Sequence, residues 1–353
     1  MSKLKNSNNS KIFFALLIIV VFIRSALRSF VVGNDTETYL HIFAAVNSIG
    51  ALKDVITSGL IYTMEIGYLF LNWLCAYIFT HYQSILIVSS AIIFIGYYKF
   101  LRKYSYSLLL AFATFFFLRF SDEAMNIIRQ SIAMVLLLKS YDYIVKNHKR
   151  KFFIAVLIAM LFHKTAIAFL PAWWICKIQF DRKMIFRFLS LSIILMIMLK
   201  VGTSVLFSLM GGYADYMSDD YDYSSGGKIA PLINVLMYTV ILFFVNYQIK
   251  KSREDNDSDV IKNMVRMRNL LFAGICILIM SLSNALIFRV AIYYYMFVIA
   301  LLPNAVKLSK NRALWSFIIF ISLFAYYFVI IMYRPDWNLV YPYSFFWEQP
   351  FLP

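Results

Sequence analysis

The chain has 353 residues, of which 62% are hydrophobic and 15% are charged, and its formal net charge is +16. Together with a mean hydropathy of +0.72, this composition excludes a water-soluble globular domain. The basic residues are spread over short loops, as topology signals are, and do not form a stripe that would bind nucleic acid. The three cysteines have no metal-ligand spacing, and we interpret them as packing residues.

Long apolar runs recur along the chain and predict an all-α, polytopic integral membrane protein, because only helices and closed barrels satisfy their backbone groups in lipid. We expect about ten to twelve transmembrane helices in a single membrane-embedded domain over residues 1–353. In chain order, the expected apolar segments are residues 12–32, 65–79, 84–101, 108–118, 126–145, 154–175, 184–199, 229–247, 270–286, 288–303 and 314–332.

The charges between these segments predict which loops face the cytoplasm. Cytoplasmic loops carry an excess of Lys and Arg, and acidic loops lie outside. The expected cytoplasmic segments are a tail at residues 1–11, a cluster at residues 146–151 and a loop at residues 249–268. The expected external segments are an acidic, tyrosine-rich loop at residues 202–228 and a tail at residues 333–353.

Two parts of the chain give conflicting topology signals. Basic clusters flank residues 154–175 on both sides, although a single crossing would place them on opposite faces. One resolution is a tight helical pair over residues 152–178, with His163 near its apex. A similar conflict between residues 99–103 and the basic N-terminal tail leaves the sides of the first four segments open.

Arg129 and the pair His163–Lys164 are the most costly groups within the apolar runs. A charge at membrane depth costs at least a few kcal/mol, so such a residue is usually paired or lines a wet cavity. On a continuous helix, Asp122 and Asn126 share the face of Arg129, and we expect them to provide its polar partners. The alternative is an arginine that extends from a helix end towards water.

The candidate residues favour chemistry on a phosphorylated lipid. Arg129, Arg289 and His163 can all face the outer half of the bilayer in the expected topology. Two guanidinium groups bind phosphate oxygens in a bidentate manner, and an imidazole exchanges protons near neutral pH. No phosphate-binding glycine loop, nucleophile elbow or metal-ligand spacing accompanies them, so we expect metal-independent chemistry without a cofactor. The alternative for His163 is a structural role at a helix break.

Several short motifs resemble the EpsG-like family of bacterial polysaccharide polymerases, which are related in role to the Wzy-type O-antigen and exopolysaccharide polymerases. The two main motifs are residues 128–133 (IRQSIA) and residues 162–166 (FHKTA). The supporting features are Asp35 with Tyr39, residues 65–68 (EIGY), Arg289 with the tyrosines that follow it, and residues 341–345 (YPYSF).

The resemblance implies a GT-C-like helical fold and a multi-pass protein of the bacterial cytoplasmic membrane. It implies a glycosyltransferase that joins undecaprenyl-diphosphate-linked repeat units at the outer face of that membrane, for O-antigen, capsule or exopolysaccharide. The implied partners are the lipid-linked donor and acceptor, the bilayer and a chain-length regulator protein, but no nucleic acid. The implied catalytic residues are His163, Glu65 and Asp35. The implied substrate-binding residues are Arg129, Arg289, Gln130, Lys164, Tyr293 and Asn126.

Two other classes of membrane protein remain open. A flippase or exporter of lipid-linked glycans would also hold buried arginines beside an outer cavity. The sequence shows no internal repeat with interrupted helices in matching halves, which transporters often have. A membrane O-acyltransferase that acts on the glycan is the third class.

Overall fold

The structure is a computed structural model that describes residues 7–209, 229–253, 259–283, 285–334, 337–349 and 351. Within these ranges the chain is helical and has no strand, apart from one isolated bridge between Arg28 and Phe345. Six helical segments of the described chain are long and apolar enough to cross a membrane: Asn8–Ala26, Gln83–Tyr104, Pro231–Ser252, Asp259–Ser281, Ile287–Leu308 and Arg312–Tyr333. The predicted all-α, polytopic membrane fold is confirmed, while the count of ten to twelve spans stays a prediction.

The chain divides into two compact units, and each is described by itself. The first unit comprises Met1–Ile167 and Ser309–Pro353, and the second comprises Ala168–Leu308. The expectation of one membrane-embedded domain over the whole chain stays a prediction.

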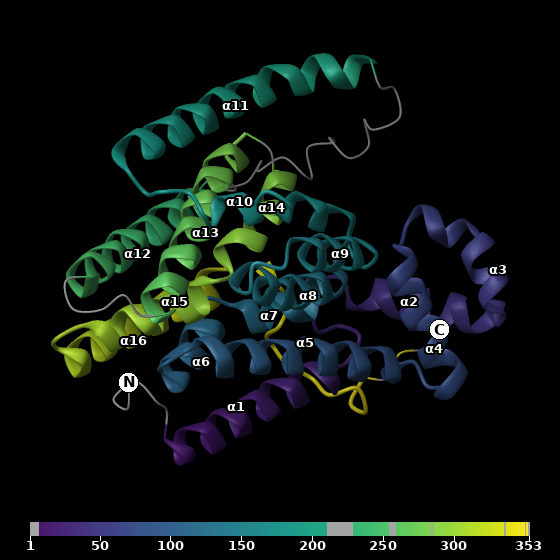
Figure 1. The fold of residues 1–353 in the computed structure, drawn as a ribbon. Helices are drawn as coiled ribbons and strands as arrows, with labels where there is room; N and C mark the ends of the chain where they lie inside the picture. The colour runs from purple at the N-terminus through teal and green to yellow at the C-terminus, as the bar shows by residue number, and fades with distance from the viewer. Residues whose placement is uncertain are drawn as a thin grey trace. The chain divides into compact units, whose positions relative to one another are not determined.

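Packed helices form the centre of the first unit (Figure 1). Its helices are α1 (Asn8–Ala26), α2 (Thr36–Ile49), α3 (Leu52–Thr57), η2 (Gly59–Tyr62), α4 (Ile66–Ile78), α5 (Gln83–Tyr104), α6 (Leu108–Phe117), α7 (Phe120–Asn126), α8 (Ile128–Val145), α9 (Lys149–Met160) and α16 (Arg312–Tyr333), and η3 (Lys164–Phe169) crosses into the second unit. Helix α1 packs against α5, α5 against α8, and α8 against α9. Fully buried aromatic side chains, including Tyr97, Phe115 and Tyr141, fill the space between them.

The two ends of this helix bundle differ in charge. At one end, the last residues of α5 bind the last turn of α8, because Lys103 and Tyr104 donate to Asp142 over 2.7 and 2.6 Å. Helix α9 begins nearby at Lys149, and the exposed lysines and arginines of residues 99–103 and 146–151 gather here. We call it the basic end.

At the opposite end of the bundle, the end of α1 meets the starts of α5 and α8. Gln83 Nε2 donates to the carbonyl oxygen of Ala26 over 2.7 Å, and Arg28 Nη2 donates to that of Met125 over 2.9 Å. The segment after α16 returns to the same place, where Ser29 and Ser344 share a backbone hydrogen bond of 3.0 Å.

Helix α4 does not cross between these two ends, which corrects the sequence-based expectation for residues 65–79. Its start lies beside α8, since Glu65 contacts Arg129, and it ends shortly before Gln83 begins α5. Both of its ends therefore lie at the opposite end. Its 13 residues extend over roughly 20 Å, less than the hydrocarbon thickness. Apolar composition alone does not reveal the direction of a helix.

The position of α4 also resolves the charge conflict of the first four segments. Helix α1 is antiparallel to α5, because Phe14 near the start of α1 stacks on Tyr98 near the end of α5 at 5.6 Å. When α4 is not counted as a crossing, the start of α1, which carries Lys11, and the cations of residues 99–103 fall at the same end. That arrangement satisfies the charge rule.

The chain is not one continuous helix from Asp122 to Arg129, so these residues do not share a helical face as the sequence analysis assumed. Helix α7 ends at Asn126, and Ile127 leaves the helical conformation with φ −91° and ψ 56° before α8 begins. Asp122 accepts instead from Arg24 Nη2 over 2.8 Å, while Arg129 pairs with Glu65.

Helix α13 is the centre of the second unit and packs against α11, α12, α14 and α15. The helices of this unit are α10 (Ala172–Ile175), α11 (Arg182–Leu209), α12 (Ile229–Arg253), α13 (Asp259–Ser281), α14 (Ala285–Tyr295) and α15 (Val298–Leu308). Helix α11 continues beyond the expected end at Leu199 into the predicted loop at residues 202–228, of which residues 210–228 lie outside the described part. In the predicted loop at residues 249–268, α12 continues to Arg253 and α13 begins at Asp259.

Candidate active site

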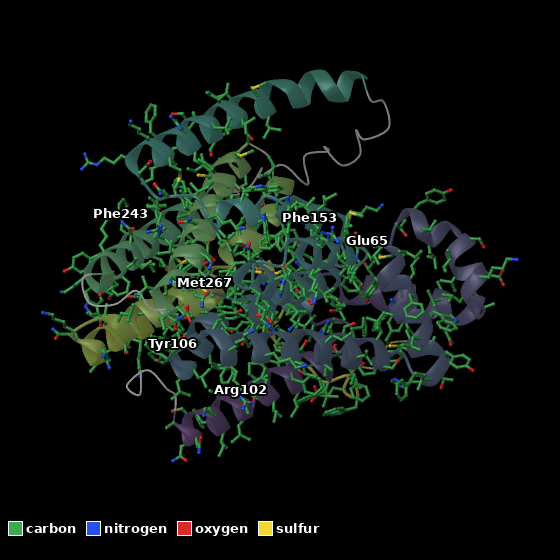
Figure 2. The ribbon with its side chains drawn as sticks, viewed as in Figure 1. Glu65, Arg102, Tyr106, Phe153, Phe243 and Met267 are labelled. Atoms are coloured by element: carbon green, nitrogen blue, oxygen red, sulfur yellow. The ribbon has the colours of Figure 1, made fainter. Side chains whose placement is uncertain are left out.

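Three groups from separate parts of the first unit converge on the carboxylate of Glu65, which is labelled in Figure 2. Arg129 Nη1, from the first turn of α8, forms a close ion pair with Oε2. His163, which follows α9, places Nδ1 3.2 Å from Oε1, at hydrogen-bonding distance but without full alignment. The backbone N–H of Lys164 donates to Oε1 over 3.2 Å. The side chains of Glu65, Arg129 and His163 are 8%, 21% and 12% exposed, so the cluster is largely buried but reachable.

Gly67 explains how Glu65 comes so close to His163. The backbone N–H of Gly67 donates to the carbonyl oxygen of Leu161 over 2.8 Å, which joins the start of α4 to the turn after α9. A Cβ atom at position 67 would lie 2.7 Å from that same oxygen, closer than carbon and oxygen approach in proteins. The close approach therefore requires glycine at position 67. This requirement gives a physical reason for the glycine in the motif at residues 65–68.

The surroundings of Glu65 hold its carboxylate in the ionised form. Burial raises the pKa of Glu65, but the contact with His163, the charge of Arg129 and the backbone N–H of Lys164 outweigh this effect and lower it to about 2. A carboxylate with so low a pKa is a weak base. The chemistry that its position allows is the orientation of Arg129 and His163.

His163 has the arrangement of a proton acceptor that a carboxylate orients. Its Nδ1 faces Glu65, whereas its Nε2 is buried and has no hydrogen-bond partner among the described residues. A hydrogen atom on Nδ1 would face the carboxylate and leave the lone pair of Nε2 available. Nucleophile activation commonly uses such a base, oriented by a third group.

Helix α2 adds an aromatic and an acidic residue to the border of the cluster. The buried phenol of Tyr39 lies close enough to Arg129 to interact with it, and its ring meets that of Tyr68 edge-on at 5.5 Å. Asp35 precedes α2 by one residue and lies one turn before Tyr39, whose N–H donates to the carbonyl oxygen of Asp35 over 3.1 Å. Tyr39 and Tyr68 were not predicted as site residues, although both belong to the short motifs that carry the family resemblance.

The EpsG family model matches residues 11–345, a range that includes every residue of this cluster. The chain belongs to the EpsG family. No curated protein matches it, and no solved structure matches it either. The predicted membership is therefore confirmed, and the apolar helices fit a membrane-bound polysaccharide polymerase. The GT-C-like likeness stays a prediction.

In this EpsG family chain, Asn126 braces the turn that carries Asp35. Its Oδ1 accepts from the N–H of Asn34 over 2.6 Å, and its Nδ2 donates to the carbonyl oxygen of Asp122 over 3.0 Å. Gln130 follows Arg129 on α8, and its side chain is buried. The predicted contacts of Asn126 and Gln130 with substrate stay predictions.

Of the other predicted substrate-binding residues, Lys164 lies in the first unit, and Arg289 and Tyr293 lie in the second. Lys164 contributes its backbone N–H to the cluster, while its side chain is exposed. Arg289 is exposed on α14, and Tyr293 is fully buried on the same helix. Because α14 belongs to the second unit, the predicted convergence of Arg289 with Arg129 stays a prediction.

Arg24 and Arg28, which were not predicted as site residues, hold the surroundings of the site together. Arg28 is fully buried and donates to the carbonyl oxygen of Met125, just before α8, and to Thr36 Oγ1 in α2 over 3.2 Å. Tyr343 of the C-terminal segment donates its hydroxyl to the carbonyl oxygen of Arg24 over 2.8 Å. The C-terminal segment therefore binds the end of α1, next to the elements that carry the cluster.

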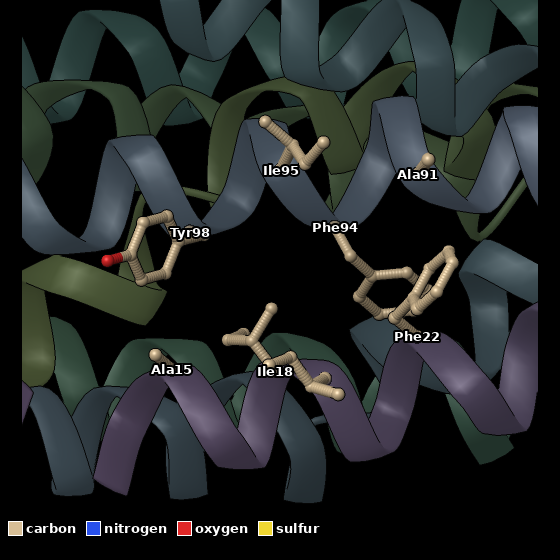
Figure 3. Close-up of a pocket in the computed structure, with 8 residues that line it drawn as sticks. Ala15, Ile18, Phe22, Ala91, Phe94, Ile95 and Tyr98 are labelled. Atoms are coloured by element: carbon tan, nitrogen blue, oxygen red, sulfur yellow. The ribbon is translucent and has the colours of Figure 1, made fainter. Parts of the chain in front are cut away.

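A cavity of about 280 Å³ lies apart from this cluster, between α1 and α5 (Figure 3). Apolar side chains line almost all of it: Ala15, Ile18, Ile19, Phe22, Ala91, Phe94, Ile95 and Tyr98. Such a lining offers packing surface for an apolar group but no acid, base or anion contact.

Proposed function

We propose that this EpsG family protein is a polysaccharide polymerase of the bacterial cytoplasmic membrane. It transfers a glycan chain from undecaprenyl diphosphate to a second lipid-linked repeat unit. The observation that carries the proposal is the convergence of Arg129 and His163 on Glu65, because one position then offers a cation for a diphosphate and an imidazole for a hydroxyl.

The charge distribution of the first unit supports a reaction at the outer face of the membrane. The cations of residues 99–103 and 146–151 gather at the basic end, which the charge rule assigns to the cytoplasm. Glu65, Arg129 and His163 lie at the opposite end of the same bundle. Lipid-linked repeat units at the outer leaflet would meet the cluster there.

The proposed reaction is a displacement at the anomeric carbon of the donor glycan. The acceptor hydroxyl oxygen forms a bond to that carbon, and the bond between the carbon and the diphosphate oxygen breaks. The electron pair of the broken bond leaves with the diphosphate, and the hydroxyl proton passes to His163 Nε2. Arg129 stabilises the negative charge that develops on the diphosphate. Electrostatic stabilisation of this kind is commonly the largest single contribution to the rate enhancement of an enzyme.

The remaining predicted residues take supporting roles in this proposal. Arg289 and Lys164 contact the diphosphate, Asp35 orients the acceptor hydroxyl, and Tyr293, Gln130 and Asn126 form or support the glycan-binding surface. The proposed transfer uses no metal ion and no cofactor. Arg129 stabilises the charge on the diphosphate, and His163 accepts the proton of the acceptor hydroxyl.

The glycan profile of a strain that lacks the gene tests the proposal. We expect single repeat units at the cell surface, and full-length polymer after complementation with the wild-type gene but not with the His163→Ala variant. A complete loss of surface glycan would identify a flippase or exporter instead. Full-length polymer with an altered mass would identify an acyltransferase.

A further inference from the structure

Helix α4 presents a stripe of large apolar side chains on its exposed face. Ile66, Phe70, Trp73 and Tyr77 follow one another at helical spacing, and Phe70 and Tyr77 are 47% and 78% exposed. The three aromatic rings form a ladder, with centroid distances of 5.8 Å between Phe70 and Trp73 and 5.6 Å between Trp73 and Tyr77. Ile78 and Phe79 extend the exposed apolar surface beyond the ladder. A contiguous surface of this kind marks an interaction site.

The other face of α4 packs against the protein. Tyr68, Leu69, Asn72 and Cys75 are buried there, and α2 is the main neighbour. The helix contains no charged residue, whereas α2 and α3 expose charged side chains such as Glu37, Lys53 and Asp54. The exposed surface therefore changes from charged to apolar between α3 and α4.

The connections of α4 place this apolar surface beside the ends of two candidate membrane spans. Helix α4 starts and ends at the opposite end of the bundle, and α5 begins there at Gln83 as a candidate membrane span. Helix α1, another candidate span, ends at the same place, where Ala26 accepts from Gln83. Helix α4 therefore lies beside the ends of two candidate spans and does not run between the two ends of the bundle.

We propose that α4 lies in the plane of the membrane, with Phe70, Trp73 and Tyr77 inserted into the interfacial region of the outer leaflet. Trp and Tyr are enriched at this depth because an apolar ring carries a polar N–H or O–H group. The N–H of Trp73 donates to the carbonyl oxygen of Gly50 over 3.0 Å, which leaves its apolar ring for the lipid. Amphipathic helices bind membranes in this orientation. The proposal concerns membrane attachment and does not depend on the proposed polymerase activity. Its consequence is that Glu65, one residue before α4, is held at the membrane surface.

Cysteine labelling in intact cells tests the orientation of α4. In a background with Cys75, Cys176 and Cys276 replaced by alanine, the single variants Thr63→Cys and Thr80→Cys flank the helix at exposed positions. We expect a membrane-impermeant maleimide to label both variants from outside. The exposed Arg150→Cys variant at the basic end is the control, and it should react with the maleimide only after the cells are permeabilised. Labelling of positions 63 and 80 from opposite sides of the membrane would overturn the proposal.

Fluorescence quenching in proteoliposomes tests the insertion depth. The chain has six tryptophans, so the Trp73 signal is obtained as the difference between wild-type protein and the Trp73→Phe variant. Lipids brominated near the headgroup end of the acyl chain should quench this signal more than lipids brominated near the chain terminus. Stronger quenching from the chain terminus would indicate a deeply inserted helix. Quenching by neither lipid would indicate that the aromatic side chains of α4 face water, as they would in a glycan-stacking surface. Each of these two results would contradict the proposal.

Discussion

Glu65 and Arg129 are separated by 64 residues in the chain, yet their ion pair joins the start of α4 to the start of α8. Both side chains are largely buried, so each neutralises a charge that would otherwise be costly at this depth. The pair therefore has two separable roles: it holds two helices together, and it keeps the guanidinium on the carboxylate that His163 also contacts.

A double-mutant cycle on this pair should separate the two roles. Removal of one partner from a buried ion pair commonly costs about 3–5 kcal/mol, because the remaining charge is left without its counterion. We expect Glu65→Gln and Arg129→Gln each to lower the thermal stability of the purified protein, and the double variant to recover part of the loss. Polymer synthesis should stay absent in all three. Additive losses of stability would contradict the coupling, and polymer synthesis by the double variant would exclude a direct role in the reaction.

The geometry of the Arg129 side chain should matter more than its charge. A guanidinium offers five donors in a planar fork, so it can bind Glu65 and a diphosphate at once, whereas a lysine ammonium is a compact point charge. We expect Arg129→Lys to lower the polymerisation rate about a hundredfold, or about 3 kcal/mol, nearly as much as Arg129→Ala. The measurement is the rate with lipid-linked repeat units at equal membrane abundance. The exposed Arg150→Lys substitution at the basic end is the matched control and should be neutral. A near-normal rate for Arg129→Lys would indicate that a charge alone is sufficient.

The stability that Glu65 provides should depend on pH. The pKa of Glu65 is lowered from 4.5 to about 2 in the folded protein, so the ionised form is favoured by folding. The contribution is complete above the unfolded pKa and is lost as the pH falls through the folded pKa. The gap in thermal unfolding temperature between wild type and Glu65→Gln should therefore be constant above about pH 5 and should shrink steadily between pH 4.5 and 2. A gap that is unchanged at pH 3 would show that ionisation of Glu65 contributes nothing to the fold.

Gly67 offers a test of the contact between α4 and the turn after α9. In the Gly67→Ala variant the new methyl group would lie 2.7 Å from the carbonyl oxygen of Leu161, so α4 must shift and Glu65 must move away from His163. We expect polymer synthesis to fall at least tenfold, since a displacement of about 1 Å in a catalytic group can cost a hundredfold. The Gly59→Ala variant is the control, because a Cβ at Gly59 meets no atom within 4 Å. Equal activity of the two variants would show that the close approach is not needed.

The helices of the first unit could be predicted from the sequence where one apolar run corresponds to one crossing. The run that ends at Val145 corresponds to α8, and the run at residues 84–101 lies within α5. The prediction failed for α4, because hydropathy reports that a helix is apolar and does not report its direction. It also failed at Ile127, where the helix breaks although the sequence has neither glycine nor proline there.

The members of the site could be predicted from the sequence, but their pairing could not. Arg129 and His163 stood out as ionisable groups within apolar runs, where the energetic cost of a charge is visible in the sequence. Glu65 was expected at the site from the family resemblance. Asp122 was expected beside Arg129 because local spacing is the only contact that a sequence shows directly. The actual partner of Arg129 comes from α4 and depends on the tertiary contact between Gly67 and Leu161.

His163 provides the prediction that distinguishes a catalyst from a structural residue. Its Nε2 is buried without a hydrogen-bond partner among the described residues, and its Nδ1 lies 3.2 Å from Glu65. A glutamine at this position retains a donor for Glu65 but cannot accept a proton at neutral pH. If His163 removes the acceptor proton, we expect His163→Gln to lower the polymerisation rate about 10²–10⁴-fold with little change in thermal stability or donor binding. The exposed His148→Gln substitution is the matched control and should behave as wild type. A wild-type distribution of polymer length in the His163→Gln strain would show instead that the imidazole serves the helix break after α9 and takes no proton.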